Sequence, residues 1–158
     1  MKKLIIYYSY TGNTKKIATT LQTKLDCDIL ELEPSVPFSS NYDEVVAEYQ
    51  NNETVKKTPE LKPISVALSN YDEIILGTPV WWYTISPVMR SFLKNNDLSA
   101  KKVYVFATNA GWLGRTFKEY ASLCPNIIDF MNIVFEPSTS HHQIKNIKEV
   151  NDWIIKIS

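Results

Sequence analysis

The chain has 158 residues, a length that fits one domain with a substantial core. Hydrophobic residues make up 44% and charged residues 22%, as in ordinary soluble globular proteins. Seventeen basic side chains balance seventeen acidic ones, so the formal net charge at pH 7 is zero and no basic excess predicts a nucleic-acid partner. The apolar runs are shorter than the roughly 18 residues of a membrane-spanning helix, and the run after Met1 is too short for a secretory signal. We therefore expect a soluble cytoplasmic protein that binds neither nucleic acid nor membrane.

Short apolar runs, which predict strands, alternate along the chain with apolar residues at helical spacing, which predict helices. Strands are predicted at residues 4–8, 27–32, 74–76, 103–107 and 133–135. Helices are predicted at residues 17–25, 88–93, 117–121 and 147–157. Ser86 is expected to cap the second of these helices, with Pro87 in its first turn, where the missing N–H group costs nothing. Residues 43–50 could form a further helix outside the sheet, within a less regular segment.

Strands that are apolar on both faces and are separated by helices predict a parallel sheet covered on both sides. Because no repeat, low-complexity segment or linker divides the chain, we expect one α/β domain over residues 1–158. Ligands of such sheets bind beyond the carboxyl ends of the strands, where the strand order reverses. Three segments that follow predicted strands are therefore the candidate site: residues 9–14, 78–86 and 108–115.

The first segment is Ser9-Tyr10-Thr11-Gly12-Asn13-Thr14, and it leads directly into the first helix. Its hydroxyl and amide groups, with the unpaired N–H groups of a helix start, favour an anion such as phosphate. A capping turn without a ligand uses the same residue types, so both interpretations stay open for this segment alone. The GxxxxGK pattern of a nucleoside-triphosphate loop, the cysteine of a phosphatase loop and the acidic pair of a response regulator are absent.

The second and third segments are rich in aromatic residues and glycine. The second contains Trp81, Trp82 and Tyr83 in succession. Because successive side chains alternate in direction, we expect at least one of these rings to be exposed or to meet a ligand, and a planar heterocycle offers a stacking surface. Packing against a neighbouring loop or subunit is the alternative. The third segment adds Trp112 and two glycines that allow close backbone approach, and by itself it is typical of an ordinary loop.

Two cysteines and two histidines complete the inventory of reactive side chains. Cys27 and Cys124 form no CxxC motif, and we expect two reduced apolar residues rather than a disulfide. Cys124 is predicted to share an apolar helix stripe with Leu113, Phe117 and Tyr120. His141 and His142 are adjacent, and since adjacent residues rarely face the same way, we expect a solvated loop pair and no metal site.

Together the three segments resemble the flavodoxin family. Residues 9–14 match the family's phosphate-loop pattern (Ser/Thr)-x-Thr-Gly-x-Thr, and residues 71–82, YDEIILGTPVWW, look like the second flavin loop of a bacterial subfamily. Residues 98–103, 108–114 and 123–125 continue the match, which covers nearly the whole chain. The resemblance implies a doubly wound, five-stranded parallel sheet in the order 2-1-3-4-5, with helices on both faces and noncovalently bound FMN.

The resemblance also implies which residues bind the cofactor. The FMN phosphate would be held by Ser9, Tyr10, Thr11, Gly12, Asn13 and Thr14. One side of the isoalloxazine would be lined by Thr78, Pro79, Val80, Trp81, Trp82 and Tyr83, and the other side or the pyrimidine edge by Thr108, Asn109, Gly111 and Trp112. The chain departs from the family pattern in two ways, because members often carry glycine where Tyr83 stands and electron carriers are usually acidic.

Three functions remain open. The resemblance implies first an electron carrier that docks transiently on redox partner proteins. The neutral charge and the aromatic residues modestly favour the alternative, an NAD(P)H-dependent FMN oxidoreductase or quinone reductase with a small oxidant. A flavin-free structural or regulatory module is the third. No catalytic side chain is expected, because a bound flavin supplies the redox chemistry of a carrier.

Overall fold

The fold is built on a parallel sheet, seen in a computed structural model that describes residues 1–50, 56–136 and 143–158. Its parallel strands lie in the order β2-β1-β3-β5-β6. Their bounds are β1 (Lys3–Tyr7), β2 (Asp28–Glu31), β3 (Glu73–Trp81), β5 (Lys102–Asn109) and β6 (Ile127–Val134). A short strand, β4 (Thr84–Ile85), pairs antiparallel with the end of β3. Counted over its parallel strands, the sheet has the predicted order, so the doubly wound α/β fold is confirmed.

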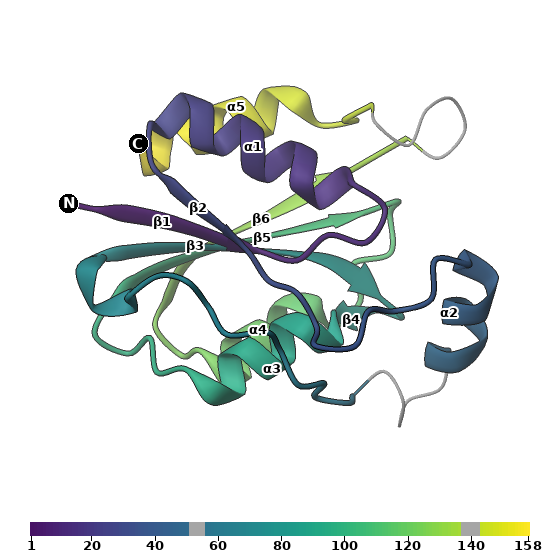
Figure 1. The fold of residues 1–158 in the computed structure, drawn as a ribbon. Coiled ribbons are helices and arrows are strands. Elements are labelled where there is room, and N and C mark those ends of the chain that lie inside the picture. Colours follow the sequence, from purple (N-terminus) through teal and green to yellow (C-terminus); the bar gives the residue numbers. More distant parts are fainter. Residues whose placement is uncertain (51–55, 137–142) are drawn as a thin grey trace.

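Helices cover both faces of the sheet (Figure 1). One face carries α1 (Asn13–Leu25) and α5 (Ile147–Ile157), and the other carries α3 (Pro87–Asn95) and α4 (Thr116–Leu123). The strands supply apolar side chains to both layers, since residues alternate across a strand. In β1, Ile5 packs in the core with α1 and α5, whereas Leu4 packs in the core with α3.

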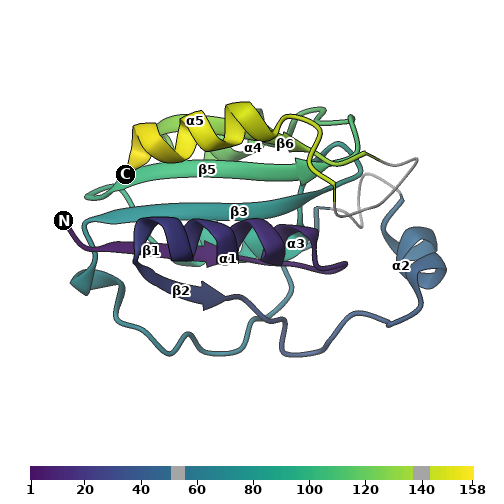
Figure 2. The ribbon, with the colours of Figure 1, turned by 90° about the horizontal axis from the view of Figure 1, so that it is seen from above.

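The helix α2 (Tyr42–Tyr49) covers neither face and lies beyond the carboxyl ends of the strands (Figures 1 and 2). Its start is capped by Asn41, whose side-chain oxygen accepts hydrogen bonds from the N–H groups of Asp43 and Glu44. The predicted helix outside the sheet is therefore confirmed. Its position brings α2 to the edge of the sheet where ligands of this architecture bind.

The third strand runs further than predicted. Predicted at residues 74–76, it continues to Trp81, because it stays paired with β5 as far as Pro79 opposite Thr108. Its last residues then pair with β4, so residues 78–86 form a strand end and a hairpin rather than a loop. Gly77 and Pro79 are residues that usually interrupt strands, which explains the early predicted end.

The last strand was also predicted too short. We expected it at residues 133–135, but β6 begins at Ile127 and ends at Val134. It is an edge strand that pairs only with β5 in the described sheet. Asp129 and Asn132 interrupt its apolar pattern, as half-exposed edge strands allow, so the continuous apolar run began only at Ile133 and the first part of the strand was missed.

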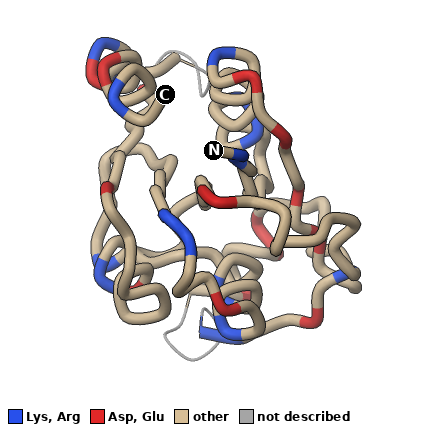
Figure 3. Tube along the Cα trace, turned by 90° about the vertical axis from the view of Figure 1, so that its left-hand side faces the viewer, with Lys and Arg blue, Asp and Glu red and all other residues tan. Residues whose placement is uncertain are grey.

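The cysteines are free, as predicted. Cys124 is buried, although α4 ends one residue before it and Leu113 precedes the helix, so the predicted stripe covers only part of this set. The pair His141 and His142 lies outside the described residues. No helix in the described ranges is long and apolar enough to cross a membrane. Both acidic and basic residues occur on the side shown in Figure 3.

Ser86 caps α3 as predicted, and its removal tests how the hairpin joins the helix. Its hydroxyl oxygen accepts a hydrogen bond from the N–H of Met89 at 3.2 Å and another from the Thr78 hydroxyl at 2.9 Å. Ser86→Ala should lower the free energy of unfolding by about 1–2 kcal/mol, since a buried cap is lost. Urea unfolding measures this change. Ser35→Ala, at an exposed site, is the control, expected within about 0.5 kcal/mol of wild type, and an equal effect of both would contradict the capping role.

Candidate functional site

A cavity of about 830 Å³ lies beyond the carboxyl ends of β1, β3 and β5. All three predicted segments contribute to it. The predicted site residues that line it are Tyr10, Thr11, Asn13, Pro79, Val80, Trp81, Trp82, Tyr83, Thr108, Asn109 and Trp112. The predicted residues outside its lining are Ser9, Gly12, Thr14, Thr78 and Gly111. A smaller cavity of about 410 Å³, near Cys124 at the opposite edge of the sheet, contains no predicted site residue.

Sequence reasoning missed part of the wall. The lining residues that were not named as site residues are Tyr42, Val45, Val46, Phe135, Glu136 and Ala110, the last of which lies within the third candidate segment. The sequence around Tyr42, Val45 and Val46 did not indicate a ligand site, because α2 reaches the cavity only through a long irregular connection. Phe135 and Glu136 follow β6, which was predicted to end at residue 135, so the rule that ligands bind at carboxyl strand ends could have found them from that predicted strand.

The first segment presents a helix start to the cavity. Gly12 takes a left-handed conformation with φ of 102°, and α1 begins at the next residue. The Ser9 hydroxyl oxygen accepts hydrogen bonds from the N–H groups of Gly12 and Lys15, both at 3.2 Å. The N–H groups of Asn13 and Thr14 find no acceptor within the described parts of the chain, as expected of a first helical turn. These free donors, together with the helix dipole, favour an anion here.

The groups around this helix start fit a phosphate. Asn13 Oδ1 is buried without a hydrogen-bond partner among the described residues, and rotation of its amide would turn an N–H group toward an anion. A Cβ atom added to Gly12 would meet no atom within 4 Å, so the backbone faces open space. The loop contains no carboxylate that would repel a dianion. An anion of the size of a phosphate monoester therefore suits this end of the cavity.

Three predicted site hydroxyls join the segments to one another. The buried hydroxyls of Thr14 and Thr108 are hydrogen bonded at 2.7 Å, which connects the start of α1 to the end of β5. The Thr78 hydroxyl donates to Ser86 and so connects β3 to α3. These threonines fix the relative positions of the segments that surround the cavity.

The aromatic residues of the second segment form a strained turn. Trp81 pairs with Thr84, so Trp82 and Tyr83 are the two central residues of a hairpin turn. Both have positive φ, 46° and 67°, which is the pattern of a type I′ turn usually built from asparagine and glycine. For bulky residues this conformation costs about 1–2 kcal/mol each. Strain of this kind is maintained by the surrounding structure and gathers at functional sites.

The three aromatic rings of the second segment and Trp112 of the third differ in accessibility. Trp81 is buried and packs edge-on against Tyr49 and Tyr10, with centroid distances of 5.3 and 5.8 Å. Trp82 is half-buried, whereas Tyr83 is 57% and Trp112 62% exposed. The prediction that at least one ring of the second segment is exposed is thus confirmed. Of these four rings, Trp82, Tyr83 and Trp112 are accessible to a ligand in the cavity.

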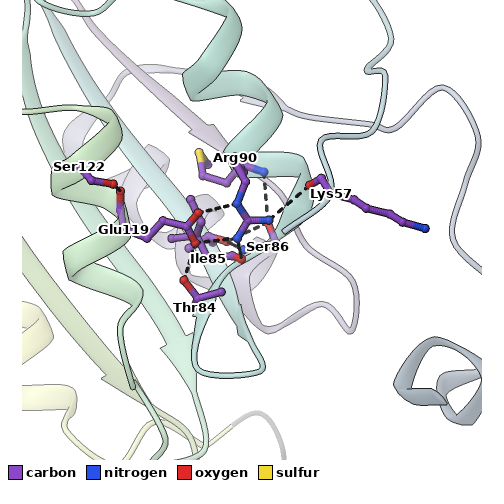
Figure 4. A network of polar contacts seen from close by, with 9 residues as sticks. Lys57, Thr84, Ile85, Ser86, Arg90, Glu119 and Ser122 are labelled. Carbon is purple, nitrogen blue, oxygen red and sulfur yellow. Dashed lines mark hydrogen bonds and ion pairs between the residues drawn. The ribbon is translucent and has the colours of Figure 1, made fainter. Parts of the chain in front are cut away.

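An ion pair between a buried arginine and a partly buried glutamate lies next to this turn (Figure 4). Arg90 of α3 is 2% exposed and donates from Nε and Nη2 to the two carboxylate oxygens of Glu119 in α4, at 2.5 and 2.6 Å. The Thr84 hydroxyl also donates to Glu119. Burial alone raises the pKa of Glu119, but the hydrogen bonds from Arg90 and Thr84 and the charge of Arg90 outweigh it, so the pKa lies below its usual value.

The lowered pKa of Glu119 predicts how stability depends on pH. Because the folded pKa lies below the unfolded value, roughly 4.3, the pair contributes stability above that pH, and the contribution is lost as pH falls through the folded pKa. Urea unfolding of wild type and Glu119→Gln between pH 7 and pH 3 measures this. The stability difference between them should be largest at neutral pH and narrow below the ordinary carboxylate range. A difference that stays constant over this range would contradict the assignment.

Comparison with known proteins identifies the class. A family model described as flavodoxin matches residues 2–152, so the chain belongs to the flavodoxin family. FMN is the cofactor that this family implies, and the helix start, the open glycine and the aromatic wall fit it. No match was found among curated proteins.

Solved structures share the fold. A candidate flavoprotein from Bacteroides uniformis ATCC 8492 is 24% identical with a TM-score of 0.77, over 98% of this chain and 97% of its own. A flavoprotein from Lactobacillus acidophilus NCFM, solved in complex with FMN, is 23% identical with a TM-score of 0.73, over 96% and 97%. Oxidised flavodoxin 2 from Bacillus cereus is 22% identical with a TM-score of 0.56, over 98% and 96%.

Proposed function

We propose that this chain binds FMN noncovalently in the 830 Å³ cavity and carries electrons between redox partners. The observation that carries the proposal is that one cavity contains both an anion-binding helix start and accessible aromatic rings. Asn13, at the open start of α1, suits an anion, and the accessible rings of Trp82 and Trp112 suit a planar heterocycle. FMN joins a phosphate to such a heterocycle, as does the cofactor bound by the Lactobacillus acidophilus flavoprotein.

Each segment has a role in this proposal. Ser9 to Thr14 hold the phosphate, with the free N–H groups of Asn13 and Thr14 as donors. Residues 78–83 line one side of the ring system, where Trp82 and Tyr83 stack and Trp81 supports them from the core. Residues 108–112 line the other side or the pyrimidine edge. Bound FMN supplies the redox chemistry, while these residues bind it, orient it and limit its contact with water.

The partners of a carrier would meet the exposed rim of the cavity. Tyr83 and Trp112 project there, and redox partner proteins would dock transiently over them. Because the chain has no net charge, long-range attraction contributes little, and the encounter rate should depend weakly on salt. By analogy with its family, we place this activity in the cytoplasm.

A second function is favoured by the same exposed rings. A rim formed by Tyr42, Tyr83 and Trp112 offers stacking surface for a second planar ring beside a bound flavin. This arrangement would suit an NAD(P)H-dependent reductase of FMN or of a quinone. The neutral charge of the chain also suits a small substrate at least as well as a basic partner protein.

Anaerobic titration of the FMN-loaded protein with NADH and NADPH separates the two functions. The flavin's visible absorption is followed, with dithionite as the control reductant. A carrier should keep its absorption with both nucleotides and lose it with dithionite. Rapid bleaching by either nucleotide would show direct hydride transfer and would replace the carrier proposal by the reductase.

A further inference from the structure

The ion pair Arg90–Glu119 lies outside the cavity lining, yet it contacts both residues of β4. Glu119 accepts from the Thr84 hydroxyl, and Arg90 Nη2 donates to the carbonyl of Ile85 at 3.2 Å. Thr84 is covalently joined to Tyr83, so the pair acts on the strand that leaves the strained turn.

Tyr83, in the turn itself, is held by contacts with Gly114 and Arg115, the two residues before α4. The N–H of Arg115 donates to the Tyr83 carbonyl at 2.6 Å. Gly114 lies so close to Tyr83 that an added Cβ atom would overlap its backbone and its Cβ. Glu119 belongs to the helix that begins just after Arg115, so the two attachments of the turn converge on the start of α4.

Arg90 also reaches the chain that follows α2. Its Nη1 donates to the carbonyl of Lys57 at 3.3 Å, and the neighbouring Ser91 hydroxyl donates to the carbonyl of Pro59 at 2.7 Å. The middle of α3 is thus bonded to the hairpin on one side and to the connection after α2 on the other. Both the hairpin and α2 supply walls of the cavity.

We propose that Arg90 and Glu119 are positioning residues, which hold β4 so that Trp82 and Tyr83 keep their left-handed conformation at the cavity and thereby set the affinity for flavin. The proposal rests on the proposed FMN site. An ion pair that only stabilises the fold would change the unfolding midpoint and leave the bound flavin's environment unaltered. A positioning pair changes the environment of the flavin as well.

Substitutions of Thr84 and Glu119 test this. Thr84→Val removes the hydroxyl that binds Glu119, while Thr84→Ser keeps it. Glu119→Gln removes the charge, and Glu149→Gln makes the same change at an exposed position of α5. FMN affinity is measured by fluorescence titration, and the flavin's environment by visible circular dichroism. Hydrogen exchange of the apoprotein reports the turn itself through the N–H of Arg115.

Glu119→Gln should raise the Kd for FMN about tenfold and Thr84→Val about fivefold, because hydrogen bonds to a charged group are lost. Both should alter the visible dichroism and speed exchange of the Arg115 N–H. Thr84→Ser should restore wild-type values, and Glu149→Gln should leave them unchanged. Wild-type affinity and dichroism in Thr84→Val and Glu119→Gln would overturn the proposal, even if both unfold more easily. If Glu119→Gln fails to fold, the comparison of Thr84→Val with Thr84→Ser tests the proposal by itself.

The exchange measurement separates this proposal from the FMN site. Failure of the wild type to bind FMN would refute the proposed function. Faster exchange of the Arg115 N–H in Thr84→Val, together with wild-type exchange in Thr84→Ser, would still support the conclusion that the Thr84–Glu119 hydrogen bond holds the turn. Unchanged exchange in a protein that binds FMN normally would refute the positioning role alone.

Discussion

Replacing Thr11 by aspartate is expected to abolish FMN binding, with at least about a hundredfold rise in Kd, because a carboxylate would face the phosphate dianion. Thr11 is exposed, lines the cavity and forms no side-chain hydrogen bond among the described residues, so the fold should tolerate the change. Flavin fluorescence titration measures the loss.

Thr19→Asp is the matched control, because it adds the same charge to an exposed position of α1 outside the cavity lining. It should leave the Kd close to that of wild type. Near-normal affinity of Thr11→Asp would show that this loop does not hold the phosphate.

Replacing Trp82 by alanine is expected to weaken FMN binding about tenfold and to shift the flavin absorption bands, since a stacking ring is removed from the wall. Trp82 is half-buried and accessible from the cavity, whereas Trp81 is held within an aromatic cluster. The same titration, followed by visible absorption, measures both effects.

Ile128→Ala is the control, because it shortens an exposed apolar side chain of β6 outside the cavity lining. It should change neither property. If Trp81, Trp82 and Tyr83 can each be replaced without changing affinity or spectrum, these rings do not stack on the flavin.

The structure of the turn explains how tyrosine can occupy position 83, where the family pattern has glycine. The flavodoxin resemblance implies glycine at this position, and Tyr83 has a φ of 67°, a conformation that glycine adopts without strain. The chain thus keeps a glycine-like backbone while adding a large ring at the rim of the cavity. The cost of that conformation is offset by the contacts of Gly114, Arg115 and Thr84 around the turn.

Much of the fold and of the site was predictable because its signals are local. Apolar runs marked the buried strands, and Ser86-Pro87 marked the start of α3. The Ser9–Thr14 segment predicted a helix start with unpaired N–H groups, because its residue types are those that favour the start of a helix.

The remaining features depend on contacts between residues distant in sequence. Trp82 and Tyr83 are improbable residues for a type I′ turn, so propensity alone pointed away from a hairpin. Arg90 and Glu119 meet only because α3 and α4 pack side by side, and α2 reaches the site through an irregular connection. Such features follow from tertiary packing rather than from local pattern.

The most direct test of the FMN site is a titration of the apoprotein with FMN and, in parallel, with riboflavin, which lacks the phosphate. Saturable binding of one FMN per chain, with altered flavin absorption and riboflavin at least about a hundredfold weaker, is the predicted result. Equal affinity for the two flavins, or no saturable binding of FMN, would contradict the assignment of the cavity.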